Sequence, residues 1–150
     1  MTELIKKLRE QTGAGVMDVK KALEEAKGDK KRALEILKSR GLEIVGKKAE
    51  RTTSQGRVEA YLHGNPPSIG VLVELLCETD FVAKTPEFAA LAKEVAMQIA
   101  SMDPTNVEDL LKQEYIREPG KTIQDLVNEA IHKFGENIKV GRFIRYKLRE

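Results

Sequence analysis

Apolar residues recur with the 3.6-residue period of an α-helix through residues 1–41. The period breaks at Thr12–Gly15, Gly28 and Gly41, and Thr2 and Asp29 are placed to cap the segments that follow them. The pattern predicts three short helices that share a thin core. The apolar positions expected in that core are Leu4, Ile5, Leu8, Val16, Val19, Leu23, Ala26, Ala33, Leu34 and Leu37.

The polar stretch at residues 42–56 separates this bundle from the rest of the chain. Its first residues are compatible with an extension of the third helix, but we interpret the whole stretch as a mobile connector. We therefore expect a three-helix N-terminal domain at 1–41, a linker at 42–56 and a C-terminal domain at 57–150.

Strand patterns open and close the C-terminal domain. Residues 57–63 alternate between polar and apolar side chains, as one half-buried strand does. Turn residues at 64–68 lead into the apolar run 69–78, which predicts an antiparallel partner, and residues 139–149 alternate again. The apolar side of the first strand, expected to be its buried side, is formed by Val58, Ala60 and Leu62.

Helical patterns occur in the sequence between the second and third of these strands. Thr85 and Pro86 predict the N-cap and first residue of one helix, Thr105 and Glu108 match a capping box for a shorter one, and residues 123–134 form another. The expected fold class is α+β: a three-helix N-terminal bundle followed by a small three-stranded antiparallel sheet covered by helices.

Helices on one side leave the second face of such a sheet bare. Leu72, Leu76 and Phe143 add apolar area on the sides opposite their neighbours. Burial of that face against a twofold copy is an economical solution. We therefore predict a homodimer through the C-terminal sheet.

Composition narrows the class of protein. With 41% hydrophobic and 33% charged residues, the chain is typical of a globular protein and not of a disordered one. No apolar run approaches the roughly 20 residues of a membrane span, and Met1–Leu4 lacks a signal-peptide pattern. We expect a cytoplasmic protein, or the mature form of an organellar one, with no membrane partner.

Basic residues are concentrated near the N-terminus, where residues 1–56 carry 14 Lys and Arg against 9 Asp and Glu. Such an excess is compatible with nucleic-acid binding. The basic side chains alternate with acidic ones along helix faces, however, and no aromatic residue is present there for a base to stack on. A solvated helical surface is the favoured interpretation, and no nucleic-acid partner is expected.

Residues that carry catalytic or metal chemistry are sparse. His63 and His132 are the only histidines, and Cys77, the only cysteine, lies in an apolar strand, so zinc-site spacings are absent and a thiol nucleophile is disfavoured. Gly13–Gly15 lies between helices, and no Gly-x-x-x-x-Gly-Lys-Ser/Thr occurs. We expect no metal, no cofactor, no directly bound nucleotide and no covalent reaction.

The stretch Glu78–Lys84 joins the apolar run to the helix that begins at Thr85. Phe81 lies there among charged residues, where the backbone leaves the core. This geometry leaves two positions open for the ring. Either the ring points outward as a docking residue, or it tucks under the following helix as part of the core.

Three runs of residues resemble the elongation factor Ts family, the guanine-nucleotide exchange factors of elongation factor Tu. The run Cys77–Lys84 reads Cys-Glu-Thr-Asp-Phe-Val-Ala-Lys, and Leu8–Leu23 is similar to the family's opening. Gly135–Ile138 is similar to a later Gly-Glu-Asn-Ile motif. Together these runs span nearly the whole chain.

The resemblance implies a factor that binds elongation factor Tu·GDP and promotes the release of GDP and Mg²⁺. It implies that Phe81 inserts between helices of elongation factor Tu beside the phosphate and magnesium site, and that Asp80 contacts the same region. The residues expected to bind elongation factor Tu are Thr79, Asp80, Phe81, Val82 and Lys84, together with Arg9, Val16, Met17 and Lys20 of the N-terminal domain.

Several of these residues also have structural interpretations. The period of Val16 suits a core position equally well, whereas Met17 lies between two core positions and is the better contact. Thr79 and Lys84 either orient the loop through hydrogen bonds or are solvated.

The resemblance also bears on architecture. It implies an N-terminal domain of the ubiquitin-associated type, and short family members form homodimers. Because Arg142–Tyr146 contains no cysteine, such a dimer is expected to be non-covalent. The region 102–121 is abbreviated compared with other short members.

Two other functions remain open. A helical adaptor would use the N-terminal bundle alone and would tolerate Phe81→Ala. A nucleic-acid-binding protein would show affinity that falls steeply with salt and no effect on GDP release.

Overall fold

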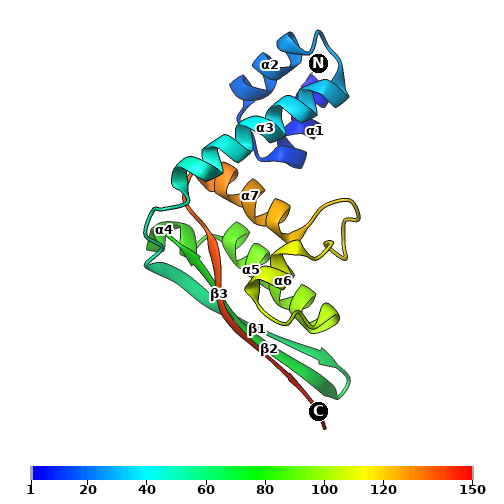
Figure 1. The fold of residues 1–150 in the computed structure, drawn as a ribbon, viewed down its shortest axis with the longest axis vertical. Coiled ribbons are helices and arrows are strands. Elements are labelled where there is room, and N and C mark those ends of the chain that lie inside the picture. The colour runs from blue at the N-terminus through cyan, green and yellow to red at the C-terminus, as the bar shows by residue number, and fades with distance from the viewer. Residues whose placement is uncertain (1, 150) are drawn as a thin grey trace. The chain divides into compact units, whose positions relative to one another are not determined.

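The computed structural model describes residues 2–149, which form two compact units (Figure 1). One unit comprises the chain up to Glu50 together with Asn128–Asn137. The other comprises Arg51–Val127 and the chain from Ile138 onward. Within 2–149, none of the helices combines the length and the apolar character that crossing a membrane requires.

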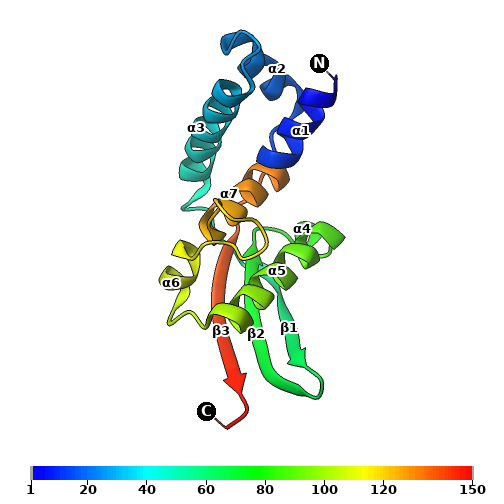
Figure 2. The ribbon, with the colours of Figure 1, turned by 90° about the vertical axis from the view of Figure 1, so that its right-hand side faces the viewer.

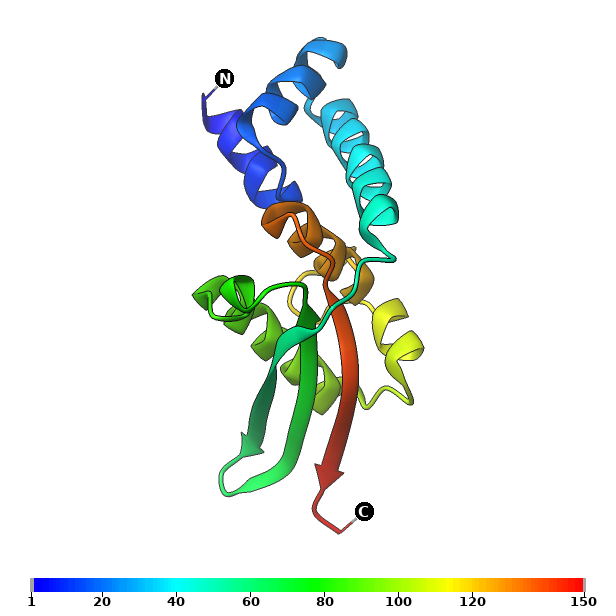
Figure 3. The same ribbon diagram turned by 90° about the vertical axis from the view of Figure 1, so that its left-hand side faces the viewer.

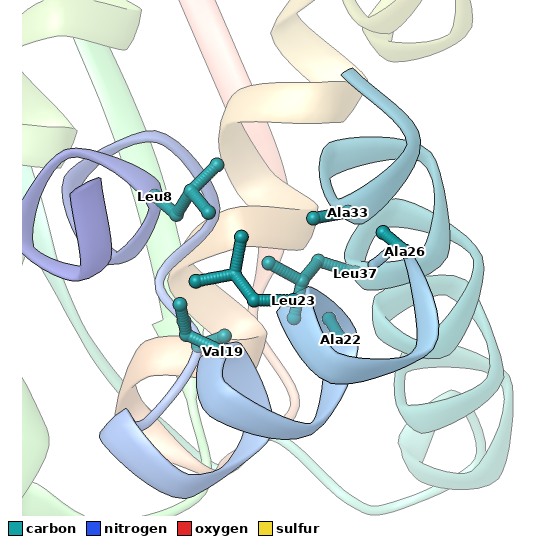
Figure 4. Close-up of a cluster of buried hydrophobic side chains, with 8 residues drawn as sticks. Leu8, Val19, Ala22, Leu23, Ala26, Ala33 and Leu37 are labelled. Atoms are coloured by element: carbon teal, nitrogen blue, oxygen red, sulfur yellow. The ribbon is translucent and has the colours of Figure 1, made fainter. Parts of the chain in front are cut away.

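Three N-terminal helices form most of the first unit: α1 (Thr2–Thr12), α2 (Val16–Glu25) and α3 (Lys30–Lys48). Asp29 caps α3 as predicted, because its side chain accepts hydrogen bonds from two main-chain amides of the first turn. The apolar sides of the helices meet in one core, shown in Figure 4. Its buried residues are Leu8, Ala14, Val19, Ala22, Leu23, Ala26, Ala33 and Leu37.

The third helix is longer than predicted. The expectation that Gly41 ends it is wrong, because α3 continues to Lys48. A glycine inside a helix costs about 1 kcal/mol relative to alanine, but the next turn carries the half-buried Ile44 and Val45, whose packing favours continuation. The expected linker therefore begins as helix, and residues 49–54 are neither helix nor strand.

A later helix, α7 (Ile123–Phe134), confirms the helix expected at 123–134, and the part from Asn128 onward belongs to the first unit. Gly13 approaches this part so closely that a Cβ atom there would lie 2.7 Å from the carbonyl oxygen of Glu129. Buried Asn137 donates a hydrogen bond to the carbonyl oxygen of Ala49 at 3.3 Å. The apolar period of α7 gave no indication of this packing.

The second unit is built on a three-stranded antiparallel sheet with β2 in the centre. Helices lie on one side of this sheet (Figure 2), so the predicted α+β class is confirmed. The strands are β1 (Gln55–Gly64), β2 (Pro67–Cys77) and β3 (Lys139–Lys147), and the helices are α4 (Asp80–Ala83), α5 (Pro86–Met102) and α6 (Val107–Lys112).

The other side of the sheet is open, as Figure 3 shows. The buried face of β2 is formed by Val71, Val73, Leu75 and Cys77. In β1, the expectation that the apolar side faces the core is wrong. Val58, Ala60 and Leu62 pair with Glu74, Leu72 and Gly70, and therefore lie on the open face.

A bulge in β3 changes which of its residues face the helices. Between Val140 and Phe143 the pairing with β2 shifts by one residue. Gly141 lies in this bulge, where a Cβ atom would approach Oε1 of Glu74 to 2.9 Å. Phe143 therefore lies on the covered face, contrary to expectation. The side chains of Ile144 and Tyr146 lie on the open face.

Helix caps are partly as predicted. Thr85 is the N-cap of α5. The predicted capping box at Thr105 and Glu108 is wrong, because Asn106 caps α6 and its Oδ1 accepts a hydrogen bond from the amide of Asp109 at 2.8 Å. Asparagine is among the strongest N-cap residues and is favoured over threonine.

Candidate functional site

A single turn of helix, α4, carries the centre of the Glu78–Lys84 stretch. The strand β2 ends at Cys77, and Thr79 has extended backbone as the N-cap of the turn. Its Oγ1 accepts a hydrogen bond from the amide of Val82 at 3.3 Å. The sequence analysis missed this helix because four residues are too few to show an apolar period. We call residues Thr79–Lys84 the Phe81 turn.

Phe81 and Val82 are neighbours with opposite environments. The Phe81 side chain is 81% exposed, whereas Val82 is 6% exposed. Successive side chains on a helix point about 100° apart, so a turn that inserts Val82 into the core directs Phe81 into solvent. Of the two positions that the sequence left open, the ring has the outward one.

An exposed ion pair crosses the same turn. Lys84 Nζ lies 3.3 Å from Oδ2 of Asp80, and both side chains are mostly in solvent. The exposed Phe81 ring therefore has a carboxylate and an ammonium group on its own helical turn. Such exposed pairs contribute a few tenths of a kcal/mol to stability.

The N-terminal candidates lie on α1 and α2, in the other unit. Val16, Met17 and Lys20 are exposed near the start of α2, and Arg9 is exposed on α1. Val16 is 39% exposed and Met17 64%, whereas Val19 of the same helix is fully buried. Val16 is therefore not a core residue. We call Val16, Met17 and Lys20 the α2 surface.

The two histidines differ in environment. His63 is exposed, and its Nδ1 is 3.0 Å from the hydroxyl of Tyr61. Burial lowers the pKa of His132 below its usual value, while the Asp18 carboxylate opposes that shift and Lys48 adds to it. Among residues 2–149, three or more His, Cys, Asp or Glu side chains do not gather as a metal site requires.

Two residues outside the predicted site contact the backbone of the Phe81 turn. Buried Cys77 donates a hydrogen bond from Sγ to the carbonyl oxygen of Thr79 at 3.1 Å. Thr85 donates from Oγ1 to the carbonyl oxygen of Val82 at 2.8 Å. The sequence identified Thr85 only as a cap of the following helix. Thr79 and Thr85 each lie three residues from Val82, and this spacing was the signal available for the additional contact.

Comparisons with known proteins agree on one family. The family model described as Elongation factor TS matches residues 78–150, which contain the whole Phe81 turn and all of β3. The elongation factor Ts of Carboxydothermus hydrogenoformans is 42% identical across 99% of this chain and 89% of its own length. Those of Caldanaerobacter subterraneus and Thermotoga maritima are each 44% identical across 99% of this chain and 96% of their own length.

These relatives contain segments that this chain lacks. The match to the Carboxydothermus protein runs over 194 residues, more than the 150 residues of this chain. The additional residues lie inside the matched span, so this is a shortened version of the shared architecture.

Proposed function

The chain belongs to the elongation factor Ts family of translation elongation factors, and we propose on that basis that it accelerates the release of GDP from elongation factor Tu. It binds elongation factor Tu·GDP and favours the nucleotide-free form, so that GDP and Mg²⁺ leave. A partner that prefers the nucleotide-free state weakens nucleotide binding by the same factor. The protein therefore acts by binding alone, without covalent chemistry. We propose that it does so in the cytoplasm.

The observation that carries this proposal is the exposed ring of Phe81 on a turn anchored by buried Val82. An aromatic side chain buries a large apolar area while it immobilises only two side-chain torsions. The ring enters the region of elongation factor Tu that holds phosphate and magnesium. Asp80 and Lys84 contact the same region, while Thr79 and Val82 hold the backbone.

The α2 surface and Arg9 form a second contact with elongation factor Tu in this proposal. Met17 supplies a flexible apolar side chain, and Lys20 and Arg9 supply positive charge. This contact increases affinity, whereas Phe81 changes the nucleotide site.

The test is the stimulated release of fluorescent GDP from elongation factor Tu, followed by stopped flow. Phe81→Ala is expected to slow stimulated release by about thirtyfold or more, as for an interface residue that contributes most of the binding energy. Ile116→Ala is a matched control, because Ile116 is an exposed apolar residue of the same unit. Unchanged release with Phe81→Ala would contradict the proposal.

We further propose that the open face of the sheet is covered by a second copy of the chain. The exposed apolar residues on this face are Val58, Leu62, Leu72, Ile144 and Tyr146. Contiguous apolar surface of this kind is typical of interfaces, and a twofold axis allows one face to cover its own copy. The dimer is non-covalent, because the only cysteine is buried Cys77.

Sedimentation equilibrium tests the dimer. Ile144→Glu places a charge on the open face and is expected to give a monomer, whereas Ile116→Glu, outside that face, leaves the dimer intact. A wild-type chain that sediments as a monomer at high concentration would contradict the proposal.

We also propose that the chain divides into an N-terminal domain at 1–41, a linker at 42–56 and a C-terminal domain at 57–150, with α3 running on into the linker and Asn128–Asn137 packing in the first unit. Because α3 extends to Lys48, the accessible part of the linker lies at residues 49–54. Limited trypsin digestion is expected to cut first at Arg51, and a first cut elsewhere would contradict this division.

A further inference from the structure

We propose that Thr85 is a positioning residue for Phe81. Its hydroxyl group fixes the backbone of the Phe81 turn, so that the ring is held outward before a partner arrives. This inference rests on the proposed function, because it explains how the exposed ring is presented to elongation factor Tu.

One hydroxyl group joins α4 to α5. Oγ1 of Thr85 donates a hydrogen bond to the carbonyl oxygen of Val82 at 2.8 Å and accepts one from the amide of Phe88 at 3.1 Å. The amide of Thr85 also donates to the carbonyl oxygen of Val82, at 3.0 Å. The end of the Phe81 turn is thereby tied to the first turn of a long helix.

A second threonine holds the other side of the same residue. The amide of Val82 donates to Oγ1 of Thr79 at 3.3 Å. Both main-chain groups of Val82 are therefore bound by threonine hydroxyls, and its side chain is buried. Cys77 holds the carbonyl oxygen of Thr79 at 3.1 Å, which extends the support back to β2.

These bonds matter because α4 has only four residues. A helix of that length is not stable on its own, since forming the first turn fixes several torsions for a single hydrogen bond. The Phe81 side chain is 81% exposed, so the backbone sets its direction more than contacts within its own subunit do. A ring that is already oriented loses less conformational entropy when it binds.

Substitutions at Thr85 separate the hydroxyl group from the shape of the side chain. Thr85→Val keeps the branched shape and removes the two hydrogen bonds of the hydroxyl group, whereas Thr85→Ser keeps the hydroxyl. Thr85→Val is expected to slow stimulated GDP release about fivefold, the effect of losing a typical N-cap, and Thr85→Ser about twofold or less. Equal losses with valine and serine would overturn the proposal.

A double-mutant cycle distinguishes positioning from a merely structural role. If Thr85 acts through the ring, Thr85→Val has no further effect on release in the Phe81→Ala background. An equal slowing in both backgrounds would overturn the proposal. Thr122→Val is the matched control: Oγ1 of Thr122 accepts from the amide of Asp125 at 3.1 Å near the start of α7, and release is expected to be unchanged.

Amide hydrogen exchange of the free protein tests the same idea without a partner. Thr85→Val is expected to speed exchange at the amides of Val82 and Lys84 about fivefold, and Thr85→Ser is not. Unchanged protection in Thr85→Val would overturn the positioning of the turn, whatever the release assay shows. Faster exchange in a protein whose wild type does not stimulate release would instead contradict the proposed function and leave the fixing of the turn supported.

Discussion

The Phe81 turn and the α2 surface both expose apolar side chains, but they are supported in different ways. The turn has a side-chain cap at Thr79, a second threonine at Thr85 and a buried anchor at Val82. The α2 helix begins after Gly15, which forms no side-chain cap hydrogen bond. Its orientation depends on the packing of Val19, Ala22 and Leu23 in the helical core.

This difference predicts two kinds of sensitivity. A surface held by local hydrogen bonds keeps its geometry as long as its own turn is intact. A surface held by packing loses its geometry when a distant core residue is removed, and a small helical core has little stability to spare. A rigid aromatic ring is therefore suited to distorting a nucleotide site, and a flexible methionine to adding contact area.

The largest effect is expected from Leu23→Ala. Leu23 is almost completely buried in the helical core, so its truncation is expected to lower the free energy of unfolding of that unit by about 3 kcal/mol. Hydrogen exchange resolved by residue provides the measurement. Amides of α2 are expected to lose protection while those of α5 keep it, and equal loss in both helices would remove the contrast between the two surfaces.

A smaller effect, on binding rather than folding, is expected from Met17→Ala. The side chain is exposed, and truncation of an interface residue outside the main contact typically costs about 1 kcal/mol or less. We expect affinity for elongation factor Tu to fall up to about fivefold, with the release rate at saturation unchanged. A reduced rate at saturation would show that the α2 surface, and not only Phe81, acts on the nucleotide site.

The first unit, which contains His132, is also expected to be sensitive to acid through that residue. Burial lowers the pKa of His132 in the folded state, so the unfolded state binds more protons as the pH falls below 6.5. The stabilisation from the neutral imidazole is therefore present above that pH and is lost below it. Thermal unfolding near neutral pH and at about pH 5.5 measures this loss.

His132→Gln is expected to make the stability of the first unit less dependent on pH. Asp18 and Lys48, which act on the imidazole in opposite directions, remain in place in this variant. The same acid-induced loss in wild type and His132→Gln would show that another group is responsible.

The smallest effect is expected from Lys84→Ala. The ion pair with Asp80 spans 3.3 Å, but both side chains are mostly exposed, so its loss is expected to change stability by only a few tenths of a kcal/mol. Amide protection in the Phe81 turn provides the measurement. A loss as large as that of Thr85→Val would mean that the ion pair, rather than the threonine hydroxyls, holds the turn.

Much of the fold follows from local sequence signals. The caps at Asp29 and Thr85 and the period of α7 were correctly predicted, because each depends on residues within one or two helical turns. The central strand was identified from its apolar run for the same reason. The exposed position of Phe81 followed from the structure, since the sequence was compatible with a buried ring as well.

The errors arise where distant residues decide. The alternation in β1 gave two faces but not which one the helices cover, and the bulge at Gly141 moved Phe143 to the covered face. Gly41 did not end α3, because side chains farther along the helix pack in its last turns. The hydrogen bond from Thr85 to Val82 was not predicted, because one hydroxyl group serves two helices at once.

We propose that Phe81 makes the chain prefer the nucleotide-free form of elongation factor Tu. The most direct measurement compares the dissociation constants of the chain for nucleotide-free and GDP-bound elongation factor Tu, for wild type and Phe81→Ala. Wild type is expected to bind the nucleotide-free form more tightly, by the same factor by which the chain weakens GDP binding, and Phe81→Ala is expected to give a ratio close to one. Equal affinities for the two forms, or a preference that survives Phe81→Ala, would contradict it.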